Sequence, residues 1–138
     1  MRRAYLDACV AIYYVEHHAV LYPRISASLF PPEGQLIVPV FSDLTRLECR
    51  VLPLRQRDHE LLARYDAFFD LTDSVRAVID RAVFDLAAEL RAQHGIKTPD
   101  ALHLAAAVRA GCDDFWTNDN RLAKAAEGRI AVVVFDEC

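Results

Sequence analysis

Short apolar runs alternate with longer stretches of helical periodicity along the first third of the chain. Residues 3–6 are largely apolar and predict a strand, and 8–20 contain no Gly or Pro and predict a helix. The uninterrupted apolar positions within 35–40 predict a second, buried strand. A helix is then expected to begin near Ser42 or Asp43.

The middle of the chain is predicted to be mostly helical, with one short strand between two helices. Pro53 is expected to end or kink the preceding helix, and 54–69 predict a further amphipathic helix followed by a brief strand at 69–71. Apolar residues then recur at helical spacing from Val75 to Leu90, which predicts a helix ending at Gly95. The oxygens that cap its first turn are expected to come from Thr72, Asp73 and Ser74.

Thr98 and Pro99 mark the start of a helix, with Thr98 as the N-cap and Pro99 at the first helical position. Almost every residue from Ala101 to Ala110 is apolar, so this helix is expected to be buried. Two more apolar strands are predicted at 115–117 and 130–135, with a short helix between them at 121–126.

Strands that alternate with helices predict an α/β fold. The expected architecture is a doubly wound parallel sheet of four to five short strands with helices on both faces. The 138 residues, 54% of them hydrophobic, match one domain spanning 1–138 and exclude intrinsic disorder. A formal net charge of −4 argues against coating nucleic acid by bulk electrostatics, although a local basic patch remains open.

The apolar run 8–15 is far shorter than the roughly 20 residues that a membrane-spanning helix needs, so a soluble, cytoplasmic protein is expected. The cysteines are scattered without a C-x-x-C pair and are expected to be reduced thiols: Cys9, Cys49, Cys112 and Cys138. Their spacing does not favour structural zinc.

Two acids follow predicted strands. Asp7 comes after the first strand and Asp119 lies two residues past Thr117, and open α/β sheets bind ligands at the carboxyl ends of their strands. Asp7 is equally suited to cap the following helix, and the two roles are compatible.

Two further acids have unusual surroundings. Leu44, Leu47 and Val51 form an apolar helical stripe that contains Glu48, so Glu48 is expected to point inward, as a ligand or as a buried partner of an arginine. Asp100 stands in the first turn of its helix among apolar neighbours, where a favourable interaction with the helix dipole is the simpler explanation.

If the four acids converge, each close pair repels by a few kcal/mol at an effective dielectric constant of about 20. A cation must offset this repulsion. Oxygen ligands without Cys or His favour a hard ion, Mg²⁺ or Mn²⁺, and such ions promote phosphodiester hydrolysis.

Four segments occur in order along the chain: Tyr5-Leu6-Asp7, Leu44-Thr45-Arg46-Leu47-Glu48, Thr98-Pro99-Asp100-Ala101-Leu102-His103-Leu104-Ala105 and Thr117-Asn118-Asp119. Together they resemble the PIN domain, and in particular the VapC-type toxins of bacterial and archaeal toxin–antitoxin pairs. The resemblance implies a doubly wound sheet, a Mg²⁺- or Mn²⁺-dependent endoribonuclease that cuts RNA, a cognate antitoxin in the active-site groove, and a homodimer.

The resemblance also assigns roles to individual residues. It makes Asp7, Glu48, Asp100 and Asp119 the acidic metal ligands, and Thr117 the hydroxyl residue that supports a carboxylate or a water. Many members carry Ser, Thr or Asn within two positions of the first aspartate, where this chain has Ala8 and Cys9. One supporting hydrogen bond is therefore expected to be missing.

A cluster of arginines follows the second acid: Arg46, Arg50, Arg55, Arg57 and Arg64. They are candidates for contacts to RNA phosphates or to an antitoxin, or they form a solvated helix face. His103 is interpreted as a buried structural histidine rather than a catalytic one.

Two alternatives to the nuclease stay open. One is a catalytically degenerate PIN-like module that binds RNA or protein. The other is a phosphohydrolase with an aspartyl nucleophile, although such enzymes carry a second aspartate two positions after the first, where this chain has Cys9.

Overall fold

The computed structural model describes residues 1–71 and 74–137. Five parallel strands form one sheet in the order β3-β2-β1-β4-β5. The strands are β1 (Arg2–Leu6), β2 (Ile37–Ser42), β3 (Val75–Ala77), β4 (Asp114–Thr117) and β5 (Ala131–Val134). The helices are α1 (Ala8–Val15), α2 (Leu21–Leu29), α3 (Asp43–Gln56), α4 (His59–Phe69), α5 (Arg81–His94), α6 (Thr98–Arg109) and α7 (Leu122–Ala126). The predicted doubly wound α/β architecture is confirmed.

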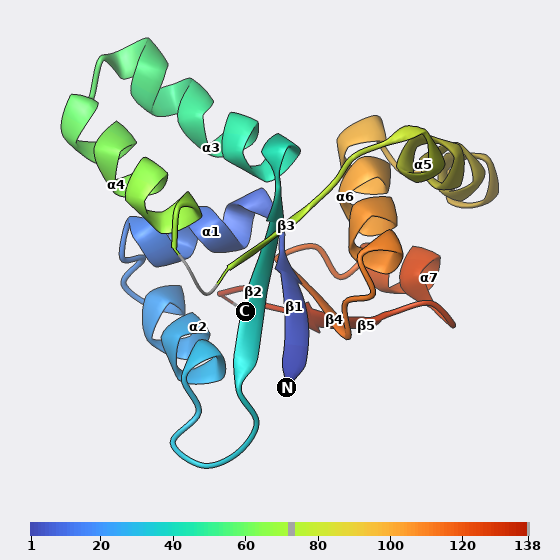
Figure 1. Ribbon diagram of the computed structural model, residues 1–138, viewed down its shortest axis with the longest axis horizontal. Coiled ribbons are helices and arrows are strands. Elements are labelled where there is room, and N and C mark those ends of the chain that lie inside the picture. Colours follow the sequence, from blue (N-terminus) through green and yellow to red (C-terminus); the bar gives the residue numbers. More distant parts are fainter. Residues whose placement is uncertain (72–73, 138) are drawn as a thin grey trace.

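The helices lie on both sides of the sheet. Figure 1 shows α1 to α4 on one side and α5 to α7 on the other. The chain runs outward from β1 through β2 to β3 and then returns to β4 on the other side of β1. The strand order therefore reverses between β1 and β4, and ligands of open α/β sheets bind at the carboxyl end of such a switch point.

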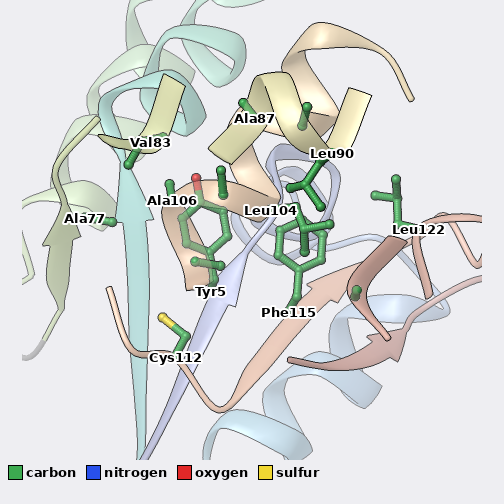
Figure 2. Close-up of a cluster of buried hydrophobic side chains, with 14 of the residues drawn as sticks. Tyr5, Ala77, Val83, Ala87, Leu90, Leu104, Ala106, Cys112, Phe115 and Leu122 are labelled. Atoms are coloured by element: carbon green, nitrogen blue, oxygen red, sulfur yellow. The ribbon is translucent and has the colours of Figure 1, made fainter. Parts of the chain in front are cut away.

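Alternate residues of the central strands enter two separate cores. Tyr5 and Phe115 face α5, α6 and α7, and their rings stack with centroids 5.5 Å apart (Figure 2). Leu6 and Trp116, one position later in each strand, pack on the other side. This two-residue period is what a strand covered on both faces requires. Alanines of α6 allow that helix to lie close against the sheet.

Two predicted boundaries in the N-terminal half were wrong: the end of the helix expected over 8–20 and the start of the helix expected at 54. The helix expected over 8–20 ends at Val15, and α2 follows it as a separate helix. Pro53 lies inside α3, which continues to Gln56. The next helix begins only at His59, because Arg57 adopts a left-handed conformation, with φ of 55°, that ends α3.

The strand expected at 69–71 was also misplaced, since Phe69 ends α4 and the strand is β3. The residues at the start of the helix predicted from Val75 instead pair with β2, and α5 begins at Arg81 with Asp80 as its N-cap. Of the expected caps, Thr72 and Asp73 lie outside the described residues. Within the described part of the chain, none of the helices has the length and apolar character that crossing a membrane requires.

Candidate functional site

Asp7 is held from two sides at the switch point. It caps α1, where the Ala8 amide donates to its Oδ1 at 2.8 Å. The Thr117 hydroxyl, at the end of β4, donates to its Oδ2 at 2.8 Å. The side chain is only 13% exposed. Thr117 therefore supplies a supporting hydrogen bond to Asp7 although Ala8 and Cys9 offer no side-chain oxygen.

Glu48 reaches the same place from α3. Ser42 caps this helix, and its side chain and that of Thr45 form a capping box. The His103 Nε2 atom donates to Glu48 Oε1 and lies 3.6 Å from Asp7 Oδ1. The Glu48 side chain remains 32% exposed, so the carboxylate is accessible from solvent.

The apolar stripe expected around Glu48 was wrong. Leu47 is 58% exposed and Val51 is 42% exposed, whereas Thr45 and Cys49 are buried. The inward face of α3 is therefore formed by small residues. Glu48 lies beside that face, and its partner is a histidine rather than the arginine considered as an alternative.

A buried chain of hydrogen bonds runs from Ser42 through Tyr5 and His103 to Glu48. The Tyr5 hydroxyl lies 2.7 Å from His103 Nδ1 and 2.7 Å from Ser42 Oγ. Because Nε2 donates to the carboxylate, a neutral His103 accepts the Tyr5 proton at Nδ1, and Tyr5 accepts from Ser42. Burial raises the pKa of the Tyr5 hydroxyl, which keeps it protonated as a donor.

Asp100 is the third acid and stands in the first turn of α6. Burial raises its pKa, and the charges of Asp7 and Asp119 raise it further. The helix start differs from expectation: Lys97 is the N-cap, so Thr98 and Pro99 occupy the first two helical positions. Asp100 is thus an acid that other acids make harder to ionise.

Asp119, the fourth acid, follows β4. Its amide donates to Thr117 Oγ1 at 3.2 Å, and Arg121 grips its carboxylate with Nε at 2.9 Å and Nη2 at 2.8 Å. These hydrogen bonds from Arg121 lower the pKa of Asp119, and the charge of Lys97 lowers it further. Asp119 therefore already has a cationic partner from its own chain.

The structure divides the predicted ligands into two groups. Ligand atoms of Asp7, Glu48 and His103 all lie within 4.8 Å of one another. Asp100 and Asp119 line an adjoining pocket of about 260 Å³. The charges of Asp7 and Glu48 both raise the pKa of the Asp100 carboxyl, so the two groups interact electrostatically.

Carboxylate oxygens with open lone pairs fit a hard divalent cation, which takes oxygen ligands and retains water. The His103 nitrogens do not fit the role of ligands, since each has a partner and the side chain is 1% exposed. The donor set therefore favours Mg²⁺ or Mn²⁺ over zinc.

Most of the arginines proposed for RNA or antitoxin contact are engaged within the chain. Arg46 and Arg50 both bind Asp66, and Arg64 donates to the Val15 carbonyl oxygen. Arg55 and Arg57 are exposed at the carboxyl end of α3. Helical rise places Arg55 roughly 10 Å along the axis from Glu48.

Three of the four cysteines lie in the described part of the chain. Cys9, Cys49 and Cys112 are free, and Cys138 lies outside the described residues. Burial raises the pKa of the Cys9 thiol to about 12 and that of Cys112 to about 11, so both stay protonated at neutral pH.

Tyr5, Ser42 and Thr45 were not expected to form part of the site, and His103 was expected to be only a structural residue. His103 is buried, as expected, but one of its two partners is a candidate ligand. A polar side chain in a buried helix three residues after Asp100 was the available signal.

Comparisons with known proteins agree with this architecture. The PIN domain family matches residues 4–128. The solved structure of VapBC2 from Rickettsia felis bound to a DNA fragment from their promoter is similar with a TM-score of 0.75, at 14% identity over 97% of this chain and 99% of that chain.

Two other solved structures are similar over nearly the whole chain. A toxin–antitoxin complex from Klebsiella pneumoniae has a TM-score of 0.67 at 19% identity, covering 98% of this chain and 99% of that one. VapC20 of Mycobacterium tuberculosis, a sarcin-ricin loop cleaving toxin, has a TM-score of 0.71 at 14% identity, covering 93% and 98%. At these identities the likeness establishes the fold. None of the curated proteins compared matches the sequence.

Proposed function

The chain belongs to the PIN domain family, and we propose that it is a Mg²⁺- or Mn²⁺-dependent endoribonuclease that acts as the toxin of a VapBC-like toxin–antitoxin pair. In this proposal residues 1–138 form a single nuclease domain that works in the cytoplasm. The observation that carries it is the pair Asp7 and Glu48, two partly exposed carboxylates held together at the switch point of the sheet.

Asp7 and Glu48 would hold the ion, and Asp100 and Asp119 would complete its surroundings directly or through water. A bound Mg²⁺ or Mn²⁺ would lower the pKa of a water molecule and stabilise negative charge on the phosphate. Thr117 and His103 keep the two carboxylates in fixed orientations, which limits the reorganisation needed when substrate arrives.

The reaction is hydrolysis of an RNA phosphodiester. Water adds to phosphorus, the bond to the 3′ oxygen breaks, and that oxygen takes up a proton. The products are a 5′-phosphate and a 3′-hydroxyl.

The proposed partners are an RNA substrate, a cognate antitoxin and a second copy of the chain. Similarity to a toxin–antitoxin complex and to VapBC2 supports the antitoxin. The resemblance to a sarcin-ricin loop cleaving toxin supports RNA as the substrate class.

The test is incubation of the purified, antitoxin-free protein with total cellular RNA, with Mg²⁺ or Mn²⁺ against EDTA. Asp7→Asn is the matched control, because Asn also caps helices and the fold is retained. We expect discrete fragments that need the metal and disappear in the variant.

Two outcomes would contradict the proposal. Intact RNA in every metal condition, with the protein folded and RNA bound, would favour the degenerate binding module. Turnover of a chromogenic phosphomonoester without RNA cleavage would favour the phosphohydrolase.

A further inference from the structure

Two pockets adjoin beside Asp100 and Asp119. The pocket that contains Asp100 and Asp119 also contains Lys97 and Arg121. A second pocket of about 190 Å³ is lined by Lys124 and Gln93. The two share His94, Ile96 and Arg121, so they form one continuous depression.

Four basic side chains line this depression, which we call the basic groove: His94, Lys97, Arg121 and Lys124. They come from the end of α5, the residue before α6, and the region of α7. These segments adjoin the sheet on the side of α5 and α6, opposite α3 and α4 (Figure 1). The groove therefore leads from the acids away from the arginine-rich helices.

We propose that the basic groove binds the RNA phosphates next to the one that is cleaved. This inference rests on the proposed nuclease function, and it moves the RNA contact from the arginines of α3 to Lys97, Arg121 and Lys124. An RNA strand with one phosphate at the acids must continue on one side of them, and its neighbouring phosphates need positive charge there.

The arrangement of charges favours this side of the site. Four carboxylates repel a polyanion, so cations that adjoin them reduce the cost of approach. Arg46 and Arg50 are occupied by Asp66. Within residues 1–71 and 74–137, neither Lys97 nor Lys124 takes part in an ion pair.

Arg121 is suited to a double role. It binds Asp119 through Nε and Nη2, which leaves Nη1 available, and its side chain is 81% exposed. A guanidinium has five donors in a fixed plane, so it can hold a carboxylate and a phosphate at once. It stands where the two pockets meet.

The experiment compares two double variants in an Asp7→Asn background, which suppresses cleavage. The test variant is Lys97→Gln/Lys124→Gln and the control is Arg55→Gln/Arg57→Gln, which removes the same charge from exposed positions on α3. Binding of a fluorescent single-stranded RNA is measured by anisotropy in Mg²⁺ at several salt concentrations. Thermal melts verify that each variant is folded.

We expect the lysine variant to lose about tenfold in affinity, and its slope of log K against log salt to fall by about 1.4, since each phosphate contact on a single strand contributes about 0.7. The arginine variant should stay within about twofold of its parent. Equal losses in both variants, or a loss confined to the arginine variant, would overturn the proposal.

Binding of an acidic peptide distinguishes an RNA ligand of the basic groove from an acidic protein ligand. Binding of poly-glutamate that is lost in the lysine variant, with RNA affinity unchanged, would assign the groove to a protein and overturn the inference. The nuclease proposal is judged separately by cleavage with the parent protein. If RNA bound to the basic groove but was never cleaved, the RNA-binding inference would hold and the nuclease proposal would be wrong.

Discussion

The two halves of the acidic site are stabilised in different ways. Asp7 and Glu48 are held by groups with little exposure to solvent: the Ala8 amide, the Thr117 hydroxyl, and His103 hydrogen-bonded to Tyr5. Asp119 is instead bound by an exposed arginine, and Asp100 bears the repulsion of its acidic neighbours.

This difference assigns separate roles to the halves. Hydrogen bonds from the Ala8 amide and the Thr117 hydroxyl orient Asp7 without cancelling its charge, and Glu48 remains 32% exposed, so the inner pair, Asp7 and Glu48, stays available to a cation. An exposed guanidinium neutralises its partner, and salt screens that interaction. We infer that the inner pair supplies most of the affinity for the metal, and that Asp100 and Asp119 have a smaller effect on that affinity.

The largest expected effect is at Asp7. Asp7→Asn should reduce RNA cleavage by at least about 100-fold, because it removes a ligand rather than a hydrogen bond that supports one. Initial rates on a defined RNA measure this loss. The matched variant Asp119→Asn should lose only about tenfold, and the reverse order would contradict the division of the site.

Tyr5→Phe tests the buried support. It removes the hydroxyl that contacts His103 Nδ1 and Ser42 Oγ, so Nδ1 loses its hydrogen-bond partner in a buried position, and it should lower the free energy of unfolding by about 1–3 kcal/mol. Metal affinity should fall by about tenfold. Urea denaturation and Mn²⁺ titration measure the two effects.

Tyr13→Phe is the control for Tyr5→Phe, since it removes an exposed hydroxyl that accepts from Asn118. It should change stability by less than about 0.5 kcal/mol. If both variants behaved alike, the chain from Tyr5 to Glu48 would have no special role.

Arg121→Gln should have a smaller effect of opposite sign. Freeing Asp119 should raise affinity for Mn²⁺ by about two- to fivefold at low salt, and the gain should shrink at about 1 M salt, where the Debye length is near 3 Å. Calorimetry at two salt concentrations measures it. Arg129→Gln is the control, because Arg129 precedes β5 and so lies at the amino-terminal ends of the parallel strands, away from the acids. It should leave the affinity for Mn²⁺ unchanged. A loss of affinity in Arg121→Gln would mean that the arginine supports the site.

The smallest effect concerns Asp100 in metal-free protein. Its pKa is raised on folding, so the folded state binds its proton more tightly and loses stability as the pH rises above the ordinary value of 3.8. Asp100→Asn should therefore stabilise the protein at pH 7 by on the order of 0.5 kcal/mol, roughly 2 °C in melting temperature.

Below about pH 3.8 the gain should vanish, because the carboxyl is then protonated in both states. Melting curves of both proteins across pH 3 to pH 8 in EDTA measure the difference. A gain that persisted in acid would show that charge is not its cause.

Sequence patterns predicted the fold class and the position of Asp7 and Asp119 at strand ends, because these depend on local apolar runs. They failed at Val75–Ala77, where helical spacing was overridden by pairing with β2. They also failed at Leu47 and Val51, since exposure on α3 depends on which face packs against its neighbours.

The hydrogen-bonded chain from Tyr5 through His103 to Glu48 could not be predicted from the spacing of residues in the sequence. Tyr5 and His103 are 98 positions apart, and only the closing of α6 over β1 brings them together. Arg121 lies two residues after Asp119, so its pairing was open to prediction, but its competition with a cation depends on geometry.

The most direct test is Mn²⁺ binding by calorimetry to the parent protein and to three single variants, Asp7→Asn, Glu48→Gln and Asp119→Asn. We expect binding to the parent, a loss of at least about tenfold in the first two variants, and a change within about threefold in the third. Loss of binding in Asp119→Asn with retention in Asp7→Asn would contradict it.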